Sequence, residues 1–319
     1  MRATLSTTVS TVMNANIGAS AAALYARESA GFDARVASAL ALLQRAAAGH
    51  PGRVVQATSL GAEDMVITDL IARHRLSIAI GTLQTGMLHA ETVALIGRIE
   101  ARYALPVEMF EPVAQSVIQF VAKHGERAMY QSIELRKGCC AMRKLEPLSR
   151  MLGSRSAWVT GMRREQSNQR GAVAFSEADD KGRVKFNPLA DWSWADVWHY
   201  IALNHVPYSP LHDQFFPSIG CAPCTRAIAV GEDFRAGRWW WENEDAKECG
   251  LHVKPHSADT PVSVVSPRET DGGIVSAQAN FGSAEVKGSP EPGRSQHEGA
   301  KEGGLHVKDS QASLIGAPA

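Results

Sequence analysis

The chain carries no excess of charge of either sign, no long apolar run and only five cysteines. Its 319 residues include 33 Lys plus Arg and 33 Asp plus Glu, a formal net charge of +0 at pH 7. Proteins whose main partner is nucleic acid usually show a basic excess, so this balance argues against that class. No apolar run approaches the roughly 20 residues of a membrane-spanning helix. With 45% hydrophobic residues, the composition is that of a globular protein able to bury a core.

The odd cysteine count and the lack of a secretory signal argue against a disulfide framework. Residues 1–23 are rich in Ser, Thr and Ala, and polar residues interrupt any apolar stretch typical of a signal peptide. We therefore expect a reducing, cytoplasmic setting, no membrane association and a disordered N-terminal arm over residues 1–30.

Apolar, strand-like runs alternate with amphipathic stretches from residue 33 onward. The predicted strands are 53–58, 77–83, 106–110 and 157–161. The predicted helices are 33–48, 64–74, 90–103, 112–123 and 143–152. A further helix follows Asp191, with Ser193 and Asp196 as its cap. The alternation predicts an α/β fold, a largely parallel sheet with flanking helices, in one domain over residues 31–254.

After Lys254 the composition shifts to Gly, Ser, Pro and Ala, so we expect residues 255–319 to be disordered. Within this tail, residues 298–308 repeat residues 244–254 at nine of eleven positions, with Gly303 in place of Cys249. We interpret the repeat as a duplicated segment that has lost its nucleophile and is now a neutral relic.

Four of the cysteines form two tight pairs, Cys139 with Cys140 and Cys221 with Cys224. Three interpretations are open: ordinary buried thiols, a structural zinc site, or a [4Fe-4S] cluster. Zinc sites usually separate paired ligands by two to four residues. Directly adjacent ligands suit the wider sulfur spacing of a cubane, so the spacing favours one iron–sulfur cluster per chain.

The fifth cysteine, Cys249, has His252 three residues away and lysines at 247 and 254. Nearby positive charge favours the thiolate, which is the nucleophilic form of cysteine. Cys249 is therefore the candidate catalytic residue, the alternative being an inert thiol.

Two loops that follow predicted strands have the composition of anion-binding sites. The first leads directly into a helix, where backbone N–H groups and the helix dipole can hold a phosphate. Its candidate residues are Ser59, Gly61, Glu63 and Asp64, and the second loop adds Thr85 and Gly86. Loops after parallel strands meet at the carboxyl edge of the sheet, where ligands bind. Ordinary strand-to-helix turns are the alternative.

Cationic residues stand beside these motifs. They are Lys144, Arg163, Arg164, Arg235 and Arg238. Guanidinium groups suit bidentate contacts to phosphate or sulfate. Solvated surface charge is the alternative, but in a neutral chain their placement predicts a focused anion pocket.

Four motifs together resemble the assimilatory adenylyl-sulfate (APS) reductases, within the wider group of phosphoadenylyl-sulfate (PAPS) reductases. They are KGCCAMRK at 137–144, GMRREQS at 161–167, GCAPCTR at 220–226 and ECGLH at 248–252. The resemblance covers about residues 35–254. It implies an adenine-nucleotide α-hydrolase-like fold with a modified PP-loop at residues 59–64, and one [4Fe-4S] cluster on the two cysteine pairs. Members with both pairs use APS, so the resemblance implies APS as the substrate.

The resemblance also implies a reaction. The Cys249 thiolate attacks the sulfur of APS, AMP leaves, and thioredoxin or another small dithiol releases sulfite from the Cys S-sulfonate. The groups that would neutralise the sulfonate oxygens are Lys144, Arg235, Arg238 and His252.

Two features depart from the family pattern: Gln84 and Met87 stand where the family commonly has Asp and Arg, and the tail after Lys254 is foreign to it. That tail has no CxxC, so the reductant must be external. The alternatives are a PAPS reductase, a PP-loop iron–sulfur tRNA-thiolating enzyme, against which the neutral charge counts, and a noncatalytic zinc-stabilised nucleotide-binding module. A homo-oligomer is compatible with the sequence.

Overall fold

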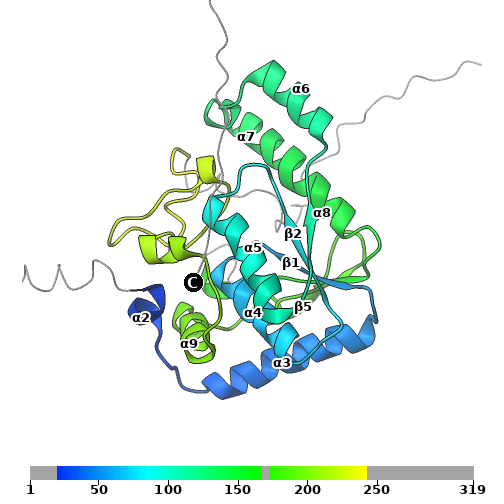
Figure 1. Ribbon diagram of the computed structural model, residues 1–319, viewed down its shortest axis with the longest axis vertical. Helices are drawn as coiled ribbons and strands as arrows, with labels where there is room; N and C mark the ends of the chain where they lie inside the picture. The colour runs from blue at the N-terminus through cyan, green and yellow to red at the C-terminus, as the bar shows by residue number, and fades with distance from the viewer. Residues whose placement is uncertain (1–19, 167–171, 243–319) are drawn as a thin grey trace, which may run out of the picture. The chain divides into compact units, whose positions relative to one another are not determined.

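The computed structural model describes residues 20–166 and 172–242 (Figure 1). Six strands form one sheet in the order β3-β2-β1-β4-β6-β5. Their bounds are β1 Val54–Thr58, β2 Ala79–Leu83, β3 Val107–Phe110, β4 Ala157–Val159, β5 Ser176–Ala178 and β6 Val184–Phe186. All neighbouring strands pair in parallel except β5, which lies antiparallel to β6 at the edge.

The strand order reverses at β1, because the chain runs outward through β2 to β3 and then returns to β4 on the other side of β1. This reversal creates a crevice at the carboxyl ends of β1 and β4, the usual position of a ligand in an open α/β sheet.

Helices connect and cover the strands. Their bounds are α2 Ala21–Tyr25, α3 Phe32–Gly49, α4 Ala62–Arg73, α5 Ala90–Tyr103, α6 Ala114–His124, α7 Ile133–Cys140, α8 Glu146–Met151 and α9 Trp194–Asn204. A π-helical turn, Ala141–Leu145, joins α7 to α8. Short 3-10 turns occupy Ala128–Tyr130, Arg164–Gln166, Pro210–Gln214 and Ala222–Cys224. None of the described helices is long and apolar enough to cross a membrane.

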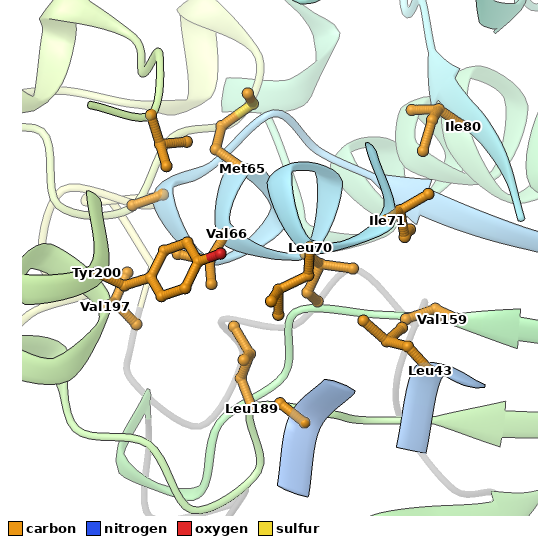
Figure 2. Close-up of a cluster of buried hydrophobic side chains, with 14 of the residues drawn as sticks. Leu43, Met65, Val66, Leu70, Ile71, Ile80, Val159, Leu189, Val197 and Tyr200 are labelled. Carbon is orange, nitrogen blue, oxygen red and sulfur yellow. The ribbon is translucent and has the colours of Figure 1, made fainter. Parts of the chain in front are cut away.

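Successive strand residues point to opposite faces of the sheet and so enter two separate apolar cores. Val54 and Val159 join the larger core, which includes residues of α3, α4, α5 and α9 (Figure 2). Their neighbours Val55 and Trp158 join a smaller core together with residues of α8. Because both faces are covered, the central strands read as continuous apolar runs in the sequence.

The sheet and its helices confirm the predicted α/β class. The α3, α5 and α6 helices match the predicted segments to within two residues at each end. The cap of α9 is also confirmed, since Ser193 Oγ accepts the Asp196 N–H at 3.0 Å and Asp196 Oδ2 accepts the Ser193 N–H at 2.9 Å.

Two parts of the structure differ from the sequence-based expectation. Residues 21–25 belong to the predicted N-terminal arm but form α2, whose buried Ala21 donates its N–H to Asp213 Oδ1 at 2.7 Å. The β5–β6 pair was not predicted. The predicted tail, residues 255–319, and residues 1–19 of the predicted arm lie outside the described residues.

Candidate functional site

A cavity of about 210 Å³ lies at the carboxyl ends of the central strands, and we call it the sheet-edge cavity. The ends of β1 and β2 and Trp158 of β4 contribute to its wall. Its position agrees with the crevice that the strand order creates.

The loop between β1 and α4 forms one side of the sheet-edge cavity through Ser59, Gly61 and Glu63. Gly61 is the N-cap of α4, so N–H groups of the first helical turn and the positive end of the helix dipole face this region. The predicted anion-binding loop therefore has the geometry that anion binding requires.

Asp64 shapes this loop from within. Its Oδ2 accepts the backbone N–H of Ser59 at 2.6 Å and the Ser59 hydroxyl at 2.7 Å. Burial raises the pKa of Asp64 to about 6, although the hydrogen bonds from Ser59 act in the opposite direction. Asp64 is absent from the cavity wall, so its predicted contact with a ligand stays a prediction.

The two consecutive arginines after β4 point to partners within the protein. Arg163 is buried and donates to Glu63 Oε1 at 2.9 Å and to Glu165 Oε2 at 2.6 Å. Arg164 donates to the carbonyl of Val173 at 2.9 Å. Neither lines the sheet-edge cavity, and their direct contact with a ligand stays a prediction.

The second predicted loop connects the sheet-edge cavity to the CxxC segment. Thr85 lines the cavity, and its Oγ1 lies 3.3 Å from Cys221 Sγ. The carbonyl of Met87 accepts the N–H of Ala222 at 2.7 Å, which fixes the two segments together. Gly86 has a φ of 71°, a conformation that favours glycine, and it does not line the cavity.

All four paired cysteines line a second, small cavity of about 10 Å³, which we call the thiol cavity. Each of them is buried, and none forms a disulfide. One helix face supplies five of the lining residues at spacings i, i+3, i+4, i+7 and i+8, namely Arg136, Cys139, Cys140, Arg143 and Lys144. The fold thus brings together two cysteine pairs that are far apart in the sequence.

The surroundings of the thiol cavity are cationic. Burial alone would raise the pKa of Cys221, but Lys144, a hydrogen bond with Thr85, and Arg238 together lower it. Thiolates are preferred ligands of iron–sulfur clusters and zinc. Within residues 20–166 and 172–242, no group of three or more Cys, His, Asp or Glu lies at the spacing that holds a single metal ion. The donor chemistry and the positive field suit an anionic, thiolate-ligated group.

The two cavities share a wall. Lys144, Cys221 and Trp239 line both of them. Arg235 and Arg238 line the sheet-edge cavity, and the Arg238 guanidinium carbon lies 4.6 Å from the centre of the Trp239 ring. Seven of the predicted ligand-binding residues therefore meet in one cavity: Ser59, Gly61, Glu63, Thr85, Lys144, Arg235 and Arg238.

A buried ion pair ties the cysteine helix to the end of the described chain. Arg136 Nε and Nη2 donate to Glu242 Oε1 and Oε2 at 2.9 and 2.7 Å. The two side chains are 0% and 3% exposed. Glu242 stands seven positions before Cys249 (249 − 242), and both Cys249 and His252 lie outside the described residues.

Several residues of the site were not predicted from the sequence. Gln166 lines the sheet-edge cavity and donates to Glu63 Oε1 at 3.0 Å. Trp158 and Trp239 also line it, and Arg136 contributes to the thiol cavity.

Comparison with known proteins places this site in a family context. The model of the phosphoadenosine phosphosulfate reductase domain matches residues 53–227. An adenosine 5'-phosphosulfate reductase of Burkholderia cepacia is 54% identical over 198 residues, covering 62% of this chain and 79% of the relative. The enzyme of the same name from Allochromatium vinosum is 53% identical over 206 residues, covering 64% and 80%.

Among solved structures, a phosphoadenylyl-sulfate (PAPS) reductase from Candida auris in a phosphate complex is similar, with a TM-score of 0.51 and 28% identity. The alignment covers 60% of this chain and 90% of that one.

Proposed function

We propose, from the premise that the chain belongs to the phosphoadenosine phosphosulfate reductase domain family, that it reduces adenylyl sulfate to sulfite and AMP with electrons from a thiol. Relatives about half identical in sequence carry the name adenosine 5'-phosphosulfate reductase. The observation that carries the proposal is the shared wall, because Lys144 and Cys221 line both an anion-suited cavity and the thiol cavity.

The charges of the sheet-edge cavity suggest how the nucleotide lies in it. The start of α4 and Ser59 offer N–H and O–H donors for the phosphate. Lys144, Arg235 and Arg238 gather at the side of Cys221 and would take the sulfonate oxygens. The phosphosulfate would then point toward the segment that carries Cys249.

We infer that the four cysteines of the thiol cavity hold one [4Fe-4S] cluster. The cavity offers four buried thiols, no disulfide and three neighbouring cations from α7 and the π turn, which offset the negative charge of thiolate ligands. When bound, the cluster supplies a fixed local charge beside Lys144. The electrons for the reaction come from elsewhere.

The proposed chemistry takes place in two steps. The Cys249 thiolate attacks the sulfur of adenylyl sulfate; a sulfur–sulfur bond forms, the sulfur–oxygen bond to the phosphate breaks, and AMP leaves. A dithiol, thioredoxin or another small protein of that type, then attacks Cys249 Sγ. Sulfite leaves with the bonding electron pair, and the second thiol closes a disulfide, so the dithiol provides both electrons.

The side chains of the cavity lower the barrier by fixing charge. Lys144, Arg235 and Arg238 stabilise the sulfonate oxygens while negative charge moves toward AMP. AMP is a good leaving group because its phosphate is already an anion held at the start of α4.

Replacement of Cys249 by serine tests the proposal. Wild-type protein given adenylyl sulfate without a reductant should release one equivalent of AMP and gain about 80 Da, the mass of SO₃, on the peptide that contains Cys249. Reduced thioredoxin should then remove the adduct and release sulfite. Cys249→Ser should keep its iron and bind the nucleotide but form neither adduct nor sulfite. An adduct on another cysteine, or sulfite formation by Cys249→Ser, would contradict the assignment.

A further inference from the structure

Arg238 occupies a narrow slot in the wall of the sheet-edge cavity. Its side chain is almost buried, with the residue 8% exposed. Nη1 donates to Ser218 Oγ at 3.4 Å and to the carbonyl of Ile219 at 3.3 Å, and the Trp239 ring lies beside the guanidinium. The planar group is thus held from several sides.

Gly220 closes this slot. A Cβ atom at residue 220 would lie 2.5 Å from Arg238 Nη2 and 2.6 Å from its Cζ, shorter than any tolerable contact. Gly220 does not have a positive φ, so its backbone could accommodate alanine. Glycine is therefore required at residue 220 by the position of the Arg238 guanidinium, which is the far end of a flexible side chain.

Trp239 forms the other boundary under visible constraint. It is 1% exposed and adopts a φ of 42°, a costly conformation for a bulky residue. Its N–H donates to the carbonyl of Cys224 at 3.2 Å, which anchors it to the CxxC segment. The strain indicates that the ring is forced into this position by the surrounding structure.

We propose that Gly220 is a positioning residue for Arg238: the missing side chain leaves the space in which the guanidinium lies flat between the 218–220 backbone and the Trp239 ring. A guanidinium binds an oxyanion in a fork whose plane must be fixed. This inference rests on the proposed function, since the oxyanion is the sulfonate of adenylyl sulfate.

The competing explanation is that Gly220 serves the adjacent Cys221 and the CxxC turn. Gly138 offers a matched control, because it directly precedes Cys139 just as Gly220 precedes Cys221. A Cβ at Gly138 would meet only Phe120 Cε2, at 3.4 Å, which is an ordinary contact. Alanine at the two glycines therefore makes the same chemical change beside the two cysteine pairs, with and without a clash with an arginine.

The first experiment measures the position of Arg238 without using activity. A dicarbonyl reagent such as phenylglyoxal modifies accessible guanidinium groups, and mass spectrometry locates the adduct. Arg238 should react slowly in the wild-type chain and in Gly138→Ala, and about tenfold faster or more in Gly220→Ala. Equal protection of Arg238 in all three proteins would overturn the proposal, whether or not the chain reduces adenylyl sulfate.

The second experiment is a double-mutant cycle on kcat/KM for adenylyl sulfate, with iron content measured for every protein. Gly220→Ala should lower kcat/KM by about 10- to 100-fold, the order expected for the loss of a hydrogen bond to a charged group. In the Arg238→Ala background, Gly220→Ala should change it by less than about twofold, because the clash is gone.

The remaining outcomes are distinct. Multiplicative losses in the double variant, or iron loss in Gly220→Ala alone, would show that Gly220 acts through Cys221, and would overturn the proposal. A wild-type chain that forms no sulfite would contradict the proposed function, while the labelling result would still decide whether Gly220 positions Arg238.

Discussion

The buried ion pair between Arg136 and Glu242 yields a sharp prediction about stability. Glu242→Leu removes the carboxylate and leaves the guanidinium of Arg136 buried without its counter-ion. Both side chains are almost fully buried, at 0% and 3% exposure, so water cannot replace the lost partner. Breaking a buried pair from one side costs about 3–5 kcal/mol of the free energy of unfolding.

The chain contains a matched control for this change. Arg226 and Glu232 form a pair of the same geometry, with two contacts of 2.8 and 2.7 Å, but their side chains are 38% and 33% exposed. An exposed pair contributes about 0–1 kcal/mol, so Glu232→Leu should have little effect. The two variants make the same substitution and differ mainly in burial.

Urea unfolding of anaerobically prepared protein, followed by tryptophan fluorescence, measures the difference. With a slope of about 3 kcal/mol per M, Glu242→Leu should lower the midpoint by about 1–2 M, and Glu232→Leu by less than about 0.3 M. The double variant Arg136→Met with Glu242→Leu should recover much of the loss, because no buried charge is left without a partner. Equal shifts for Glu242→Leu and Glu232→Leu would refute the reasoning.

Three further predictions concern the metal, the loop and the substrate. Iron and acid-labile sulfide should each approach about four per chain and be lost when serine replaces any cysteine of the two pairs; stoichiometric zinc after anaerobic, iron-replete expression would contradict this. Burial raises the pKa of Asp64 from 3.8 to about 6, so its contribution to stability is complete below pH 3.8 and is lost as the pH rises through 6. The loss is about 3 kcal/mol at most, and Asp64→Asn should flatten the urea midpoint between pH 5 and 7 relative to the wild type; parallel pH profiles would count against it. Steady-state kinetics should give a higher kcat/KM for adenylyl sulfate than for its 3'-phosphorylated form, and an equal or lower value would mean that the cysteine pattern is a poor guide to specificity.

Features with a local sequence signal were predictable. The strand-to-helix alternation predicted the sheet, because both faces of its central strands are buried and read as apolar runs. The spacing of the two cysteine pairs predicted their meeting, and the fold places all four on the thiol cavity. The cap of α9 follows from two side chains three residues apart.

Features that depend on distant partners gave no such signal. Arg136 is an ordinary basic residue until Glu242, 106 positions away, reaches it. Arg163 was expected at a ligand, yet its nearest partner is Glu63, 100 positions away. The β5 strand was missed because two of its three residues are exposed and lack the apolar alternation of a half-buried strand.

The π-helical turn between α7 and α8 makes chain length matter more than residue identity at residues 141–145. On its N-terminal side the helix presents Cys139 and Cys140 to the thiol cavity, and on its C-terminal side α8 presents Met151 to the smaller core. One residue corresponds to about 100° of helix rotation. A single-residue deletion here would therefore turn one of these faces away from its partner, whereas a substitution such as Met142→Leu would leave both in phase. Natural or engineered variants of this segment should accordingly tolerate changes of side chain far better than insertions or deletions.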